Sequence, residues 1–133
     1  MESDNSNKTI LVVDDEPDIV FVLTMALKKR GYHTEEAFNG LEALAKIREH
    51  IPDAVIMDIM MPKMDGRSVN LKLKQDPKTA GIPVIIITGK GDFKELLDLH
   101  EGVNVAAYLE KPFPISVLME KLNNILNEVD SRK

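Results

Sequence analysis

The sequence contains no cysteine, which excludes a disulfide framework and a thiolate metal site and is compatible with a reducing compartment. No apolar run approaches the length of a membrane-spanning helix, and residues 1–8 are polar, unlike the apolar core of a signal peptide. Lys and Arg number 17 against 22 Asp and Glu, and no basic stripe that would bind phosphate backbones is present. These absences predict a cytoplasmic protein that binds neither membrane nor nucleic acid directly.

The 133 residues suit one compact domain, and the shares of hydrophobic and charged residues, 44% and 29%, are typical of a globular protein. We expect this domain over residues 9–128, with flexible tails over residues 1–8 and 129–133. No output domain follows it in the sequence. We therefore expect a stand-alone protein or a domain taken from a longer one.

Short β-branched runs alternate with longer amphipathic stretches, a pattern that predicts an α/β fold with a doubly wound parallel sheet. The runs at 10–13, 54–57 and 84–87 are continuously apolar, as expected for strands covered on both faces, whereas the polar run from 33 predicts an edge strand. The predicted strands are residues 9–13, 33–38, 54–57, 84–88 and 107–110. The predicted helices are residues 17–30, 40–50, 66–75, 92–101 and 114–127.

Charged and hydroxyl side chains stand where the predicted strands end, and the carboxyl ends of parallel strands meet at one edge of a sheet. Asp14 and Asp15 follow the first strand, Asp58 the third, Thr88 ends the fourth and Lys111 follows the fifth. Clustered carboxylates repel each other unless a cation compensates them, and Mg²⁺ prefers oxygen ligands. An aspartate beside a metal and a lysine can act as nucleophile toward phosphorus. The pattern therefore indicates phosphoryl transfer, with Asp58 as the candidate nucleophile.

Four motifs in this order resemble the receiver domain of response regulators, the CheY-like superfamily of two-component signalling, over nearly the whole chain. The motifs are ILVVDDE at residues 10–16, DIMMPKMDG at 58–66, TG at 88–89 and KPF at 111–113. The resemblance implies a flavodoxin-like (βα)5 three-layer sandwich with five parallel strands in the order 2-1-3-4-5. Each motif alone is weak, but together they predict one site.

The resemblance also implies a role for each matching residue. Asp58 would accept the phosphoryl group, and Thr88 and Lys111 would contact its oxygens. Direct Mg²⁺ or Mn²⁺ ligands would be Asp15, Asp58 and the Met60 carbonyl, with Asp14 helping through water. The backbone N–H groups of Met60 and Gly89 would complete the phosphate site, and Tyr108 would switch rotamer as Thr88 moves. The Lys-Pro peptide bond is often cis in the family, and Lys111–Pro112 could adopt this form.

The implied partners are a sensor histidine kinase or a phosphotransfer protein, and a downstream protein that binds the face formed by residues 92–101, 107–110 and 114–127. The protein would be a signalling phosphoacceptor that catalyses its own phosphorylation and dephosphorylation, and a monomer able to dimerise when phosphorylated. Lys90 and Met60 would tune how readily water attacks the phosphate. The run from Gly102 to Tyr108 is longer than usual in the family, which predicts a rebuilt loop before the last strand.

Each site residue also has an ordinary structural explanation. The acids at 14–16 could favour a helix N-terminus, Thr88 could be a strand residue, Lys111 a solvated lysine and Tyr108 a half-buried aromatic. Their joint placement at strand ends favours the site. Three other functions are a receiver fold that docks partners without phosphorylation, an aspartyl-phosphate phosphatase and an FMN protein. The phosphatase would need a second carboxylate where Met60 stands, and the FMN protein hydroxyls and glycine in place of residues 14–16.

Overall fold

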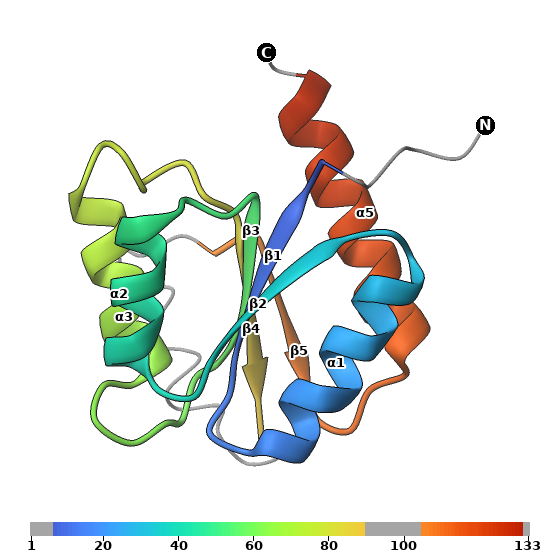
Figure 1. Cartoon of the computed structure of the whole chain (residues 1–133), viewed down its shortest axis with the longest axis horizontal. Helices are drawn as coiled ribbons and strands as arrows, with labels where there is room; N and C mark the ends of the chain where they lie inside the picture. The colour runs from blue at the N-terminus through green and yellow to red at the C-terminus, as the bar shows by residue number, and fades with distance from the viewer. Residues whose placement is uncertain (1–6, 90–104, 132–133) are drawn as a thin grey trace.

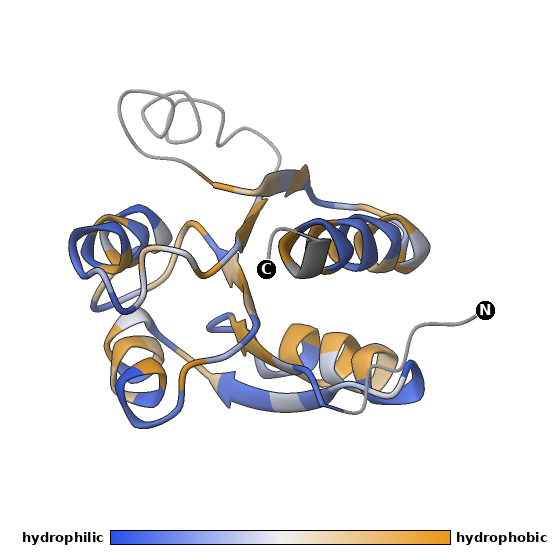
Figure 2. Cartoon of the chain, turned by 90° about the horizontal axis from the view of Figure 1, so that it is seen from above, coloured by the Kyte–Doolittle hydropathy of each residue, from blue (hydrophilic) through white to orange (hydrophobic). Residues whose placement is uncertain are grey.

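Five parallel strands form one sheet in the order β2-β1-β3-β4-β5, as predicted. The computed structural model describes residues 7–89 and 105–131. Among the described helices, α1 and α5 cover one face of the sheet and α2 and α3 the other, giving three layers (Figures 1 and 2). The elements are β1 Thr9–Val13, α1 Pro17–Lys29, β2 His33–Ala37, α2 Gly40–Glu49, β3 Ala54–Asp58, α3 Gly66–Gln75, β4 Val84–Thr88, β5 Ala107–Glu110 and α5 Ile115–Ser131.

The ends of several elements differ slightly from those predicted. β3 includes Asp58, because its backbone continues the parallel ladder beside Ile87 of β4. α5 begins at Ile115 and continues to Ser131, so residues 129–131, predicted as tail, are helical. The sequence after residue 127 contains no glycine or proline to end a helix, although the apolar periodicity weakens there. The helix predicted at residues 92–101 lies outside the described residues.

The buried side chains explain why the three apolar runs are inner strands. All residues of β3 and β4 are buried, and β1 is buried from its second residue on, whereas β2 is buried only at Ala37. One apolar cluster lies between the sheet and α2 and α3, and another between the sheet and α1 and α5. In the described part of the chain, no helix has both the length and the apolar composition needed to cross a bilayer.

Local signals fix where the helices begin and end. Pro17 occupies the first turn of α1, and Gly31 follows that helix with φ 96°, a conformation that glycine adopts without strain. The Asn39 side chain caps α2 by accepting from Glu42 N at 2.9 Å, and Asp65 caps α3. Each helix therefore starts a few residues after the strand that precedes it. The short loops leave the carboxyl ends of the strands open at one edge of the sheet.

Lys63, between β3 and α3, is the one described residue other than glycine that has a positive φ, at 67°. A side chain is strained there by about 1 kcal/mol. We expect Lys63→Gly to stabilise the domain by about 0.5 kcal/mol, since relief of that strain exceeds the added entropy of the unfolded chain. Urea unfolding measures the change. Lys72→Gly, on the exposed side of α3, should instead destabilise by about 1 kcal/mol, and equal signs would contradict the strain.

Candidate functional site

The predicted site residues meet at the carboxyl edge of the sheet. Asp14 directly follows β1, Asp58 ends β3, Thr88 ends β4 and Lys111 directly follows β5. The parallel register pairs Thr88 with Glu110, and the Lys111 N–H donates to the Thr88 carbonyl at 2.8 Å. Residues up to 97 positions apart in the chain, such as Asp14 and Lys111, are thereby brought into contact.

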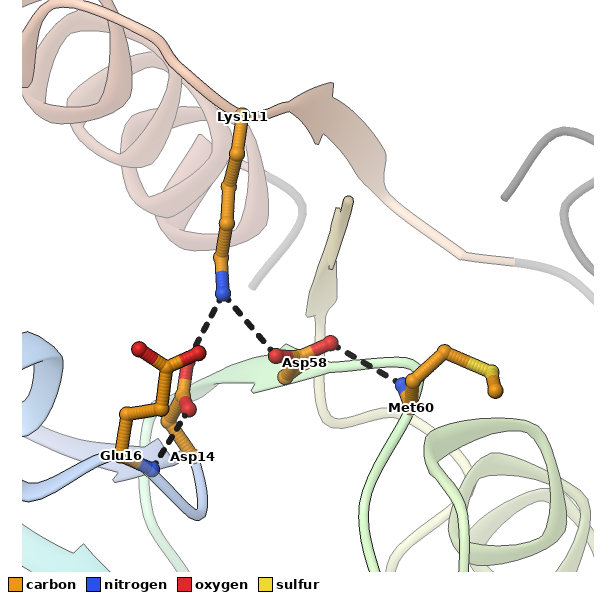
Figure 3. Close-up of polar contacts among 5 residues, drawn as sticks. All are labelled: Asp14, Glu16, Asp58, Met60 and Lys111. Atoms are coloured by element: carbon orange, nitrogen blue, oxygen red, sulfur yellow. Dashed lines mark hydrogen bonds and ion pairs between the residues drawn. The ribbon is translucent and has the colours of Figure 1, made fainter. Parts of the chain in front are cut away.

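Lys111 links the two buried carboxylates of the site. Its Nζ lies 3.0 Å from Asp58 Oδ2 and 3.4 Å from Asp14 Oδ2. Figure 3 draws both contacts as dashed lines. The side chains of Asp14 and Asp58 are only 1% and 7% exposed, and that of Lys111 is 24% exposed. Buried carboxylates are costly unless a cation or hydrogen bonds compensate them. The one positive charge of Lys111 is therefore shared between the two negative charges of Asp14 and Asp58 and neutralises neither completely.

A backbone hydrogen bond fixes the orientation of the Asp58 carboxylate. Met60 N donates to Asp58 Oδ1 at 3.0 Å, while Lys111 occupies the other oxygen (Figure 3). Ile59, the residue that follows Asp58, is held by two backbone hydrogen bonds. Its N–H donates to the Ile87 carbonyl, and its carbonyl accepts from Gly66 N. The predicted contact of the Met60 N–H is with a phosphate; in this structure the N–H binds Asp58.

Burial and the neighbouring charges shift the pKa values of Asp14 and Lys111. Burial, aided by the negative charge of Asp58, raises the pKa of Asp14 from 3.8 to about 6, against the hydrogen bond from Glu16 N and the charge of Lys111. Burial alone lowers the pKa of the Lys111 ammonium, but its hydrogen bond to Asp58 and the charges of Asp58 and Asp14 raise it overall. The Lys111 ammonium is therefore always charged at neutral pH, whereas the negative charge that Asp14 carries at that pH reduces the stability of the folded protein.

Three consecutive acids form a potential cation site next to the ion pairs. One carboxylate oxygen from each of Asp14, Asp15 and Glu16 lies within 4.8 Å of the other two, with Asp14 buried and the other two residues exposed. Asp58 is joined to this group through Lys111, which it shares with Asp14. The sequence analysis selected Asp14 and Asp15 but not Glu16. The sequence signal that could have identified Glu16 is its position directly after Asp14 and Asp15.

The remaining predicted residues that the structure describes lie on β4 and β5 or directly after these strands. Thr88 is buried at the end of β4, and Gly89 directly follows it. Tyr108 lies on β5 with 44% of its surface exposed. The Lys111–Pro112 peptide bond is cis, as the resemblance implies. Lys90, predicted to tune phosphate hydrolysis, lies outside the described residues.

Comparisons with known proteins show the family to which the chain belongs. The profile of the response regulator receiver domain family matches residues 10–123, a segment that contains all the site residues. The chain is 36% identical to the protein PilH of Pseudomonas aeruginosa over 118 residues, which cover 88% of this chain and 96% of PilH. It is 37% identical to the phosphate regulon transcriptional regulatory protein PhoB of the same organism over 90% of this chain and 52% of PhoB. It thus spans about half the length of several curated relatives that it matches.

Solved structures share the fold over the same extent. The signal receiver domain of a signal transduction histidine kinase from Syntrophus aciditrophicus superposes with a TM-score of 0.86 at 33% identity, covering 92% of both chains. A CheY-like response regulator receiver domain protein from Methanospirillum hungatei gives a TM-score of 0.87 at 28% identity, covering 95% of this chain and 98% of that one. Sequence match and fold agree, and the chain belongs to the response regulator receiver domain family.

Proposed function

We propose that this receiver domain accepts a phosphoryl group on Asp58 from a phosphohistidine of a sensor histidine kinase or a phosphotransfer protein. The 3.0 Å contact between Lys111 Nζ and Asp58 Oδ2 carries the proposal, because it places a permanent positive charge beside a nearly buried carboxylate. A carboxylate held in this way can act as a nucleophile toward phosphorus, with the charge of the transferred group balanced by the lysine. The family match supports a phosphohistidine as donor.

The transfer requires one bond to form and one to break. A lone pair of an Asp58 carboxylate oxygen attacks phosphorus, while the bond from phosphorus to the donor imidazole nitrogen breaks and its electron pair returns to the imidazole. The Met60 N–H holds the carboxylate in a fixed orientation during the attack. The Lys111 ammonium stabilises the negative charge on the phosphoryl oxygens. The protein is thus both the substrate and the catalyst of its phosphorylation.

The atoms that the site offers as metal ligands fit Mg²⁺ or Mn²⁺. Among residues 7–89 and 105–131, the metal ligands that converge there are all oxygen atoms, and Lys111 alone faces the buried carboxylates of Asp14 and Asp58 beside two further exposed acids. We assign Asp15, Asp58 and the Met60 carbonyl as direct ligands and Asp14 as a ligand through water. When bound, the cation would neutralise part of the negative charge on the phosphoryl oxygens.

The proposal extends to the output of the domain. Thr88 would move toward the phosphoryl group, and Tyr108 on the neighbouring strand would turn inward from its exposed position. A downstream protein would then bind a face that includes β5 and α5 and sense this change. The third element predicted for that face, at residues 92–101, lies outside the described residues.

Intact mass spectrometry tests the phosphoacceptor directly. Wild-type protein incubated with acetyl phosphate or phosphoramidate and Mg²⁺ should gain the mass of one phosphoryl group, and chelation of Mg²⁺ should prevent the gain. Asp58→Ala should gain none, because the nucleophile is missing. Asp65→Asn is the matched control in the same loop, since asparagine can still cap α3, and it should be phosphorylated like the wild type.

Two outcomes would contradict the proposal. Phosphorylation of Asp58→Ala at the wild-type level would show that another residue accepts the group. Wild-type protein that remains unmodified by small donors and by phosphorylated kinases would favour a receiver fold that docks partners without phosphorylation.

A further inference from the structure

Glu16 occupies the N-cap position of α1 but does not use its side chain to cap the helix. Its backbone is nevertheless fixed, because its carbonyl accepts from Ile19 N at 3.1 Å and Val20 N at 3.2 Å, and its N–H donates to Asp14 Oδ1 at 2.9 Å. Most N-caps are short side chains that reach the first free N–H groups. The side chain of Glu16 is therefore available for another role.

That side chain extends toward charges of its own sign. The Glu16 carboxylate lies beside that of Asp14 in Figure 3, and one of its oxygens is within 4.8 Å of one oxygen each of Asp14 and Asp15. A favourable interaction with the helix dipole explains an acid at the start of α1, but it does not explain a carboxylate placed against two others. A divalent cation held by this group would offset the repulsion among them.

We propose that Glu16 is a third acidic group of the divalent-cation site, one that strengthens the binding of Mg²⁺ or Mn²⁺ by its charge. The inference rests on the proposed function, since it concerns the cation that phosphorylation of Asp58 requires. It adds a residue whose charge sets the cation concentration at which the site is half occupied. Because Glu16 is exposed to solvent beside Asp14 and Asp15, its charge can act on a cation that keeps part of its water shell.

The expected effect follows from Coulomb's law. A unit charge about 6 Å from a divalent cation changes its binding roughly tenfold even at the dielectric constant of water. Salt screens an exposed group further, so we expect Glu16→Gln to weaken Mn²⁺ binding about fivefold at low ionic strength. The same substitution should bring a smaller rise in thermal midpoint on adding Mg²⁺, because stabilisation by a ligand follows its affinity.

Asp18→Asn provides a matched control. Asp18 is exposed in the first turn of the same helix, yet it is not part of the acidic cluster. Its loss removes the same unit of charge and the same helix-dipole interaction, so a general effect of acidity would appear in both variants. We expect Mn²⁺ binding by Asp18→Asn to stay within about twofold of the wild type, because charge attraction falls with distance.

Mn²⁺ titration followed by electron paramagnetic resonance gives the affinity of the unphosphorylated full chain, and competition gives that of Mg²⁺. The proposal predicts weaker binding in Glu16→Gln and near wild-type binding in Asp18→Asn. Binding unchanged in Glu16→Gln but weakened in Asp15→Asn would overturn the role of Glu16 and leave the cation site intact. Equal losses in Glu16→Gln and Asp18→Asn would also overturn it.

The same titration separates this inference from the proposed function. Wild-type protein that binds no Mn²⁺ would overturn both. Wild-type protein that binds Mn²⁺ with the predicted Glu16→Gln effect, but whose Asp58→Ala variant is phosphorylated normally, would overturn only the phosphoacceptor assignment.

Discussion

Gly66→Ala is expected to destabilise the domain by about 3 kcal/mol, the upper part of the usual range for overpacking. A Cβ at this position would lie 2.6 Å from the Asp58 carbonyl oxygen and 2.9 Å from Ile59 Cα, both backbone atoms. That backbone is held by hydrogen bonds from Gly66 N to the Ile59 carbonyl and from Ile59 N to the Ile87 carbonyl. Neither contact can be relieved by rotating a side chain, so the strand end that carries Asp58 must move.

Urea unfolding followed by circular dichroism measures this loss, and Gly81→Ala is its control. Nothing lies within 4 Å of a Cβ built at Gly81, so that substitution should change stability by less than about 0.5 kcal/mol. The Gly66→Ala variant that remains folded should also accept phosphate more slowly than Gly81→Ala, because Asp58 is displaced from Lys111. Equal stability of the two variants would show that the loop after β3 can yield.

The arrangement of strands and site residues could be predicted because its signals are local. Continuously apolar runs mark strands that are buried on both faces, and a polar run marks β2 as an edge. Gly31 and Asp65 lie where a helix ends or begins, and both act as their residue types predict. Parallel strands then bring Asp58 and Lys111 to one edge without further information. The strand order itself came from the family resemblance.

Other features depend on the geometry of the loops or on how distant segments pack, neither of which the apolar and polar patterns specify. The direction of the Glu16 side chain depends on the loop after β1, and the bond from Met60 N to Asp58 depends on the turn after β3. The raised pKa of Asp14 arises from burial beneath Lys111 and near Asp58, residues far away in the sequence. The continuation of α5 to Ser131 needed evidence beyond its apolar periodicity.

These tertiary features share one consequence, which is that the site without a cation is electrostatically unsatisfied. Two buried carboxylates share Lys111, and the exposed pair Asp15 and Glu16 adds negative charge beside them. Active sites commonly hold such unfavourable charge, since the same arrangement binds the cation or the reacting group. The cost should be measurable at Asp14, the least exposed of the four acids.

Asp14→Asn is expected to stabilise the cation-free protein by about 3 kcal/mol at pH 7, since roughly two pKa units correspond to that free energy. The amide keeps the shape of the protonated acid and can still accept from Glu16 N. A simple salt-bridge interpretation predicts the opposite sign, because the variant loses the contact with Lys111. The sign of the change therefore decides whether burial or pairing dominates at Asp14.

The pH dependence follows from the direction of the shift. Because the pKa of Asp14 is raised to about 6 in the folded protein, the folded state binds more protons than the unfolded state between about pH 4 and 6. Stability from this group therefore falls as the pH rises through that window, and the penalty is complete above it. The gain in stability of Asp14→Asn over the wild type should be near zero at about pH 4 and reach its full value by about pH 7.

Urea unfolding at a series of pH values, with a chelator present, measures the difference between wild type and Asp14→Asn. Asp76→Asn, an exposed aspartate at the end of α3 far from the site, should track the wild type at every pH, since its amide can still accept from Lys78 N. Saturating Mg²⁺ should reduce the advantage of Asp14→Asn, because the cation binds the wild-type carboxylates in the folded state. An Asp14→Asn variant less stable than wild type at pH 7 without cation would show that the ion pair with Lys111 outweighs the burial of Asp14.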